Sequence, residues 1–195
     1  MFTGIIESLG KVTDVRNDGE NKHFYIESKL TNELKIDQSV AHNGVCLTVV
    51  GIQDQVYQVT AIKETLLKSA LASQLKKGQP VNLERCMKMN GRLDGHMVYG
   101  HVDSIGRLKE KVEKSGSWEL TISFSEEFSK LIIEKGSISL NGASLTVFDV
   151  TPNTFKVAII PYTYNNTIIQ NMKVGDDVNL EFDVIGKYIL KNLTS

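Results

Sequence analysis

The residues best suited to chemistry lie in a seven-residue segment that occurs twice. NGVCLTV spans residues 43–49 and contains Cys46, and NGASLTV spans residues 141–147 and contains Ser144. The thiol and the hydroxyl are 98 residues apart (144 minus 46), about half of the 195-residue chain. Solenoid repeats have periods of about 20–50 residues. The segment therefore predicts two copies of one domain, in which a thiol in the first copy is replaced by a hydroxyl in the second.

Each of these candidates has a catalytic and a structural interpretation. The Cys46 thiol or thiolate could stabilise a reacting species or move a proton, or it could be a small buried apolar group. The Ser144 hydroxyl could bind a ligand or a strand backbone, but no Asp-His pair lies near it in sequence, so a nucleophilic triad is not expected. His101 stands where the first copy has Ile5. A histidine there could act as an acid or base, or form a hydrogen bond at an interface.

The remaining thiol and imidazole groups are expected to have structural roles. Cys86 is expected to be a small packed group, His23 and His42 to serve at the surface or in packing, and His96 to orient a linker. The two cysteines occur in no CxxC or Cys/His spacing, so neither a disulfide framework nor a zinc site is expected. We expect no metal and no cofactor, and a reducing cytoplasm is the default location.

Bulk composition limits the classes of function. The chain is 41% hydrophobic and 23% charged, with a formal net charge of −1. These values are typical of a soluble globular protein, and the near-zero charge gives no reason to expect nucleic acid or a membrane surface as a partner. The N-terminus lacks the basic and apolar stretches of a signal peptide, and no apolar run approaches the ~20 residues of a membrane span.

Short strands and turn signals dominate the first half. Strands are predicted over 5–15, 23–27, 56–62 and 80–86, and one long strand over 39–52, bent near the Asn-Gly pair. Short helices are predicted over 31–34 and 65–77, the second with apolar residues at three- and four-residue spacing and Gly78 just beyond it. This pattern favours a small antiparallel barrel over a parallel α/β sheet.

The second half repeats the first. GIIESLGKV at residues 4–12 aligns with GHVDSIGRL at 100–108, residues 60–65 align with 158–163, and KGQPVNLE at 77–84 aligns with VGDDVNLE at 174–181. A short helix over 125–132 is expected to be capped by Ser125. Residues 87–97 are predicted as a linker. A terminal helix from Val184 has an apolar face that either packs on its own barrel or binds other subunits.

Four motifs in order resemble the riboflavin synthase family, α-chain type. They are MFTGIIE at residues 1–7, NGVCLTV at 43–49, GHMVYGHVD at 95–103 and SLTV at 144–147. The resemblance covers both halves. It implies an all-β fold of two tandem six-stranded Greek-key β-barrels with short helices and a C-terminal helix. The implied divisions are a first lumazine-binding barrel (1–86), a linker (87–97), a second barrel (98–183) and a helix (184–195) that forms a homotrimer.

The resemblance also implies a reaction and its residues. Two molecules of 6,7-dimethyl-8-ribityllumazine exchange a four-carbon unit, giving riboflavin and 5-amino-6-ribitylamino-uracil. The site in the family lies between the first barrel of one subunit and the second barrel of its neighbour. The implied catalytic residues are Cys46, His101, Ser144 and Asp183. The implied substrate-binding residues are Gly4, Ile5, Ile6, Cys46, Leu47, Thr48, Thr60, Ala61, Ile62, Lys63, Glu64, Thr65, Gly100, His101, Val102, Lys135, Ser144, Leu145, Thr146, Ala158, Ile159, Ile160, Pro161, Tyr162 and Thr163.

Three points qualify what the resemblance implies. The first copy has Arg85 and Cys86 near the position of Asp183, so the repeat does not support a shared role for that carboxylate. The chain stops at Ser195, which predicts a short final helix and a labile trimer; lumazine synthase is a further partner to consider. A non-catalytic lumazine- or flavin-binding protein is the main alternative, and a flavin reductase is a weaker one because no glycine-rich nucleotide-binding signature is present.

Overall fold

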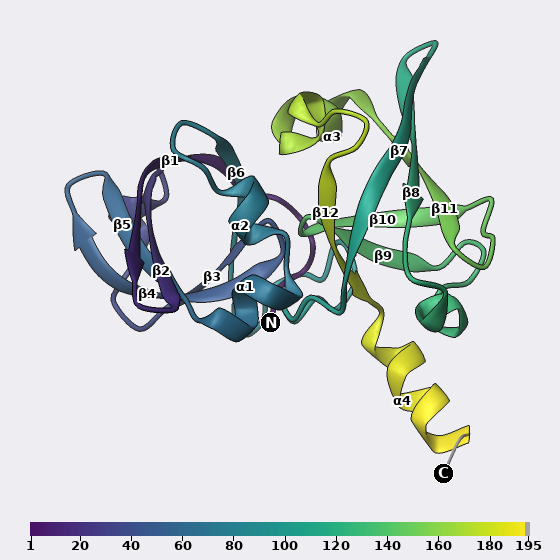
Figure 1. Ribbon diagram of the computed structural model, residues 1–195, viewed down its shortest axis with the longest axis horizontal. Helices are drawn as coiled ribbons and strands as arrows, with labels where there is room; N and C mark the ends of the chain where they lie inside the picture. The colour runs from purple at the N-terminus through teal and green to yellow at the C-terminus, as the bar shows by residue number, and fades with distance from the viewer. Residues whose placement is uncertain (194–195) are drawn as a thin grey trace.

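Two closed antiparallel β-barrels lie side by side in the computed structural model, which describes residues 1–193 (Figure 1). Six strands close each barrel, in the orders β1-β2-β5-β4-β3-β6 and β10-β11-β8-β7-β12-β9. In the first barrel, β3, β4 and β5 follow one another while β6 returns beside β3, which is a Greek key. The predicted all-β fold of two six-stranded Greek-key barrels is confirmed.

The strands are short, and alternate side chains point into the barrels. The first barrel contains β1 (Ser8–Asp18), β2 (Asn21–Glu27), β3 (Ser39–His42), β4 (Val45–Gln53), β5 (Val56–Ala61) and β6 (Pro80–Arg85). The second contains β7 (Ser104–Lys114), β8 (Ser117–Ser123), β9 (Ser137–Leu140), β10 (Ala143–Phe148), β11 (Thr154–Ile159) and β12 (Asp177–Phe182). Large buried side chains such as Phe24 and Tyr57, or Phe155 and Phe182, fill the two separate cores.

The prediction of one bent strand over 39–52 was wrong, because the Asn-Gly pair forms a hairpin turn. Asn43 and Gly44 have φ of 46° and 80°, and their counterparts Asn141 and Gly142 have φ of 47° and 84°. Positive φ at both central residues is the signature of the type I′ turn, which matches the twist of an antiparallel pair. Each repeat segment is therefore a turn followed by one strand, and β3 and β9 run back alongside it.

The opening strand begins at Ser8 rather than at residue 5, and the helix expected over 65–77 is two helices. Residues 3–7, which precede β1, bond to β6 of the first barrel and also reach the second barrel, as described below. Ser69 is extended (φ −133°, ψ 162°), so the helical segment breaks into α1 (Lys63–Lys68) and α2 (Leu71–Gln74). Gly78 has a positive φ of 87° but lies beyond both helices.

The other helices are short. The 3₁₀ helices are η1 (Thr31–Glu33), η2 (Glu126–Leu131) and η3 (Ile168–Asn171), and the α-helices are α3 (Pro161–Asn166) and α4 (Val184–Leu193). Ser125 does not cap η2 through its side chain, because its hydroxyl donates to the Glu127 carboxylate instead. Figure 1 shows α4 projecting away from the second barrel. Residues 194 and 195 of the predicted terminal helix lie outside the described residues.

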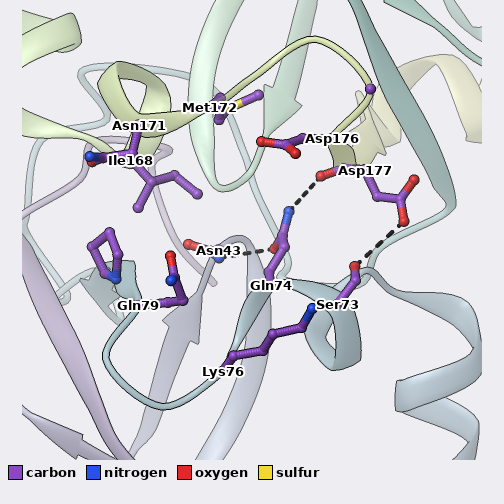
Figure 2. A pocket seen from close by; sticks show the side chains of 12 residues that line it. Asn43, Ser73, Gln74, Lys76, Gln79, Ile168, Asn171, Met172, Asp176 and Asp177 are labelled. Carbon is purple, nitrogen blue, oxygen red and sulfur yellow. Dashed lines mark hydrogen bonds between the residues drawn. The ribbon is translucent and has the colours of Figure 1, made fainter.

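Buried amides join the two barrels. Asn82 donates its side-chain N–H to the carbonyl of Asn141, and Asn179 donates to the carbonyl of Asn43, at 2.9 and 2.8 Å. Gln74 lies between the barrels, accepting from the Asn43 amide at 2.9 Å and donating to the Asp177 carbonyl at 2.9 Å, beside a cleft of about 370 Å³ (Figure 2). Because the Asn-Gly turns are themselves members of this network, it fixes the relative position of the two repeat segments.

Candidate active site

The segment that precedes the first strand of each barrel contacts the Asn-Gly hairpin of the other barrel. Phe2 and Val98 pair as a two-residue bridge, with N–H to O=C distances of 2.6 and 3.1 Å in the two directions. Phe2 is fully buried, packing with Ala41, Val98 and Cys46. Residues 3–7 and 99–103 follow this crossing, and we call them the first and second leading segments. The Gly4 carbonyl of the first contacts Ser144 of the second barrel, and the Gly100 carbonyl of the second contacts Cys46 of the first barrel. Each segment then returns to its own barrel, where the Glu7 N–H donates to Leu83 and the Asp103 N–H donates to Leu180.

The second leading segment lies against Cys46. The Cys46 N–H donates to the Gly100 carbonyl at 2.9 Å, and a Cβ placed on Gly100 would lie 2.6 Å from the Cys46 Cβ. A glycine is therefore required at 100, where φ is also +77°. A cavity of about 180 Å³ opens here; it is lined by Val45, Cys46, Glu64, Thr65, Lys68, Ser69, Gly100, His101 and Val102. We call this the first half-site.

The first leading segment lies against Ser144 in the same way. The Ser144 N–H donates to the Gly4 carbonyl at 2.8 Å, and a Cβ on Gly4 (φ +78°) would lie 2.6 Å from the Ser144 Cβ. This second half-site pairs Ser144 with residues 4–6, as the first pairs Cys46 with residues 100–102. The structure thus brings together predicted site residues that are nearly 140 residues apart in sequence.

His96 distinguishes the second half-site from the first. Its Nδ1 lies 2.7 Å from the Ser144 Oγ, and the preceding Gly95 is so close that a Cβ there would lie 2.8 Å from the Ser144 Cβ. Burial lowers the His96 pKa, and the nearby Asp183 carboxylate partly opposes that shift. His96 therefore does more than orient the linker. The repeat could not reveal this histidine, because it lies in residues 87–97, outside the aligned segments of the two copies.

The Cys46 thiol is only partly buried, yet burial is the main influence on its ionisation. Burial raises the Cys46 pKa above its ordinary value, and a hydrogen bond with Ser39 opposes the rise. The group next to the cavity is therefore a protonated thiol rather than a preformed thiolate. It can donate a proton or a weak hydrogen bond, whereas a base is needed before it can act as a nucleophile.

Two buried carboxylates escaped the sequence analysis. Glu84 on β6 and Glu181 on β12 are each only 3% exposed. Glu84 accepts from the backbone N–H groups of Thr3 and Gly4, and Glu181 accepts from those of residues 99–101. The alignment of 77–84 with 174–181 contained the signal, because both copies have the sequence Val-Asn-Leu-Glu and so place an acidic residue near the end of the strand.

Two further predicted site residues, Asp183 and Lys135, lie outside the lining of the cavity beside Cys46. Asp183 accepts from the Ile185 N–H at 3.0 Å, so its carboxylate also caps the start of α4. Lys135 is exposed, with left-handed backbone (φ 63°) and its Nζ 5.7 Å from the centre of the Phe148 ring.

The remaining predicted binding residues differ widely in exposure. Ala61 and Ile159 are fully buried in the barrel cores, so their side chains cannot reach a ligand. The buried residues are Gly4, Leu47, Ala61, Gly100 and Ile159; the half-buried ones are Ile6, Thr60, Thr65, Val102, Leu145 and Thr163. The exposed ones are Ile5, Thr48, Ile62, Lys63, Glu64, His101, Thr146, Ala158, Ile160, Pro161 and Tyr162.

Two negative findings, on metal sites and on membrane spans, apply to residues 1–193. In that range no three His, Cys, Asp or Glu side chains gather closely enough to hold a metal ion. No helix in the same range has the length and apolar character needed to cross a bilayer. Cys46 and Cys86 are both free thiols.

The family model of the lumazine binding domain matches residues 3–86 and again 99–183. Each of the two barrels is therefore a lumazine binding domain, which makes the chain a lumazine-binding protein. A riboflavin synthase of Actinobacillus pleuropneumoniae is 42% identical over 190 residues, covering 97% of this chain and 88% of the relative. One of Bacillus subtilis is 38% identical, covering 99% and 90%. The chain belongs to the riboflavin synthase family and is accordingly an enzyme, of the transferase class.

Solved structures agree with the fold. LumP crystallised with riboflavin superposes with a TM-score of 0.86 at 20% identity, covering 93% of this chain and 99% of LumP. LumP crystallised with 6,7-dimethyl-8-(1'-D-ribityl) lumazine gives a TM-score of 0.84 at 18% identity.

Proposed function

We propose that this chain converts two molecules of 6,7-dimethyl-8-ribityllumazine into riboflavin and 5-amino-6-ribitylamino-uracil by moving a four-carbon unit from one to the other. The observation that carries this proposal is the pair of half-sites, built from the same hairpin and an equivalent leading segment but with different reactive groups. Two like pockets suit a reaction whose donor and acceptor are the same molecule. The relatives support this substrate class, since one is a riboflavin synthase and LumP has been crystallised with riboflavin and with 6,7-dimethyl-8-(1'-D-ribityl) lumazine.

The protein supplies position and proton transfer. One substrate provides the carbon nucleophile through its acidic C7-methyl group and the other provides the electrophile, so the exchange balances without an external oxidant. Holding two reactants in a productive orientation can lower a barrier by about 7–11 kcal/mol. In this proposal His101, which is exposed and lines the first half-site, takes the methyl proton.

The two hairpin residues have complementary roles in the proposal. Cys46, a protonated thiol, donates toward the developing negative charge in the first half-site. Ser144, already hydrogen-bonded to His96, orients the ring in the second, and Asp183 acts through His96. The exposed side chains of Thr48, Thr146 and Lys135 bind polar edges of the substrates in this proposal. Several of the buried binding residues act through backbone N–H and C=O groups.

The complete site forms between copies in a homotrimer. The cavity beside Cys46 contains none of the second half-site's residues among those that the structure describes, so one copy alone offers two separate half-sites. The apolar face of α4, formed by Ile185, Tyr188, Ile189 and Leu193, is 52–79% exposed and provides a surface for assembly. In this proposal residues 1–86 and 98–183 each bind one lumazine, 87–97 link them, and 184–195 hold the trimer together.

One further partner and the location belong to the same proposal. We expect the chain to associate with lumazine synthase, the enzyme that makes this substrate. The two free thiols suit a reducing cytoplasm.

Complementation between inactive variants tests the shared site. Cys46→Ser leaves the second half-site intact, and Ser144→Ala leaves the first intact. Each variant alone is expected to turn over slowly, whereas refolding the two together restores activity, because mixed trimers contain some sites with both halves unaltered. A mixture no more active than the sum of its parts would place both half-sites within one copy and overturn the shared site.

A further inference from the structure

The two buried carboxylates, Glu84 and Glu181, have no role in the reaction described so far. Burying a carboxylate is costly unless it is paired or hydrogen-bonded. Within residues 1–193, neither group has a lysine or arginine partner at ion-pair distance. Their stabilisation comes mainly from backbone N–H donors, with the Thr3 hydroxyl also bonded to Glu84 and the charge of Lys187 acting on Glu181.

Three donors converge on each side chain. The Oε1 of Glu181 accepts from the Tyr99 N–H at 2.6 Å, and its Oε2 accepts from the N–H groups of Gly100 and His101, both at 2.9 Å. Glu84 accepts from the Thr3 N–H at 2.6 Å, the Thr3 hydroxyl at 2.8 Å and the Gly4 N–H at 3.0 Å. A glutamine has one acceptor oxygen instead of two, so it cannot reproduce either set.

The segment that each carboxylate holds belongs to the opposite half-site. Glu181 is on the second barrel, but the residues it holds include Gly100 and His101, which lie against Cys46 of the first barrel. Glu84 is on the first barrel, but it holds Gly4 against Ser144 of the second. Because the leading segments cross, each barrel's carboxylate acts on the other barrel's reactive group.

We propose that Glu181 is a positioning residue for the first half-site and Glu84 its counterpart for the second. Each carboxylate locks a leading segment over the reactive hairpin of the other barrel, and so fixes the alignment of Cys46 with His101, or of Ser144 with residues 4–6. The consequence for catalysis rests on the proposed function. The crossed positioning itself can be measured without substrate.

Thiol reactivity in the ligand-free protein tests the crossing. All variants carry Cys86→Ser, so that Cys46 is the only thiol, and iodoacetamide alkylation is followed over a range of pH. The fit separates the Cys46 pKa from the rate constant of the fully ionised thiolate, and only the second reports how well the site is covered. Losing one or more charge-assisted bonds should open the segment, so Glu181→Gln is expected to raise that limiting rate constant about tenfold or more.

Glu84→Gln is the matched control, since it makes the same change at the equivalent position in the other barrel. It is expected to leave Cys46 reactivity within about twofold of the parent. The mirror experiment uses Ser144→Cys in a protein that lacks both natural cysteines. There Glu84→Gln should accelerate alkylation, and Glu181→Gln should not.

Equal effects of the two variants on Cys46, or no effect of Glu181→Gln, would overturn the proposal in favour of general stabilisation. If Glu181→Gln does not fold, Glu181→Asp carries the same test, because it keeps both oxygens but withdraws them by one methylene. In turnover, Glu181→Asp should recover part of the kcat that Glu181→Gln loses. A protein with crossed thiol effects but no riboflavin formation would keep the positioning and refute only the proposed function.

Discussion

The close contact between Gly100 and Cys46 gives a sharp quantitative prediction. In Gly100→Ala, the new Cβ would lie 2.6 Å from the Cys46 Cβ and 2.8 Å from its backbone N. Relieving that overlap should cost about 1–3 kcal/mol, and the alanine must also adopt φ of +77°, which costs about 1–2 kcal/mol. The free energy of unfolding should fall by about 2–5 kcal/mol. A shift of the segment by about 1 Å should lower turnover by about 100-fold.

Gly78→Ala is the matched control for that prediction. Gly78 has φ of +87°, but within residues 1–193 no heavy atom outside Gly78 and its two chain neighbours lies within 4 Å of the point that an alanine methyl group would occupy. The control therefore incurs only the backbone cost, about 1–2 kcal/mol, with unchanged turnover. Urea denaturation and the rate of riboflavin formation, measured on both variants, separate the two effects. A folded Gly100→Ala protein that turns over like Gly78→Ala would refute the argument that this contact aligns the first half-site.

Three further predictions address other parts of the structure. Cys46→Ser should lose most turnover while still binding lumazine, as judged by ligand fluorescence, whereas Cys86→Ser should match the parent; equal turnover in both would mean that the Cys46 thiol is not chemically special. Burial lowers the His42 pKa from 6.5 to about 4, so the unfolded chain binds the proton more readily, and stability is lost as the pH falls from about 6.5 to 4, by up to about 3 kcal/mol. In urea titrations at pH 7 and pH 4, His42→Gln should lose less unfolding free energy between the two pH values than the parent does. An equal loss in the variant and the parent would assign the pH dependence to other groups. Asn179→Ala removes bonds to the Asn43 carbonyl and the Ala70 N–H, and should destabilise the protein by about 2–5 kcal/mol in urea, whereas a change below about 0.5 kcal/mol would show that the network is not rigidly formed.

The sequence was most informative where local chemistry and the repeat agreed. Alternating apolar residues and turn dipeptides predict short antiparallel strands, and the duplicated NG segments predict the two reactive hairpins. The Asn-Gly turn could also have been recognised, because this dipeptide strongly favours a type I′ hairpin. A continuous apolar pattern on both sides of the pair made 39–52 resemble one strand. The helix break at Ser69 also involves residues that are close in sequence, since the Ser69 hydroxyl donates a hydrogen bond to the Thr65 carbonyl.

The crossing of the leading segments could not be predicted from either copy alone. Sequence similarity shows that residues 4–12 and 100–108 are equivalent, but it does not show which barrel each segment contacts. That choice depends on the Phe2–Val98 bridge and on glycine positions whose Cβ space is taken by the opposite hairpin. His96 and the buried carboxylates were missed for the same reason, because their partners are distant in sequence and lie across the barrel interface.

The most direct measurement of the central claim uses only the protein and 6,7-dimethyl-8-ribityllumazine. Absorbance and fluorescence report lumazine loss and riboflavin gain, and chromatography reports the released pyrimidine. Two unlike half-sites for one substrate predict that two lumazines disappear for every riboflavin formed, with one 5-amino-6-ribitylamino-uracil released and no added metal or redox cofactor. Tight binding of lumazine without any riboflavin would contradict the account and leave a protein that only binds the ligand.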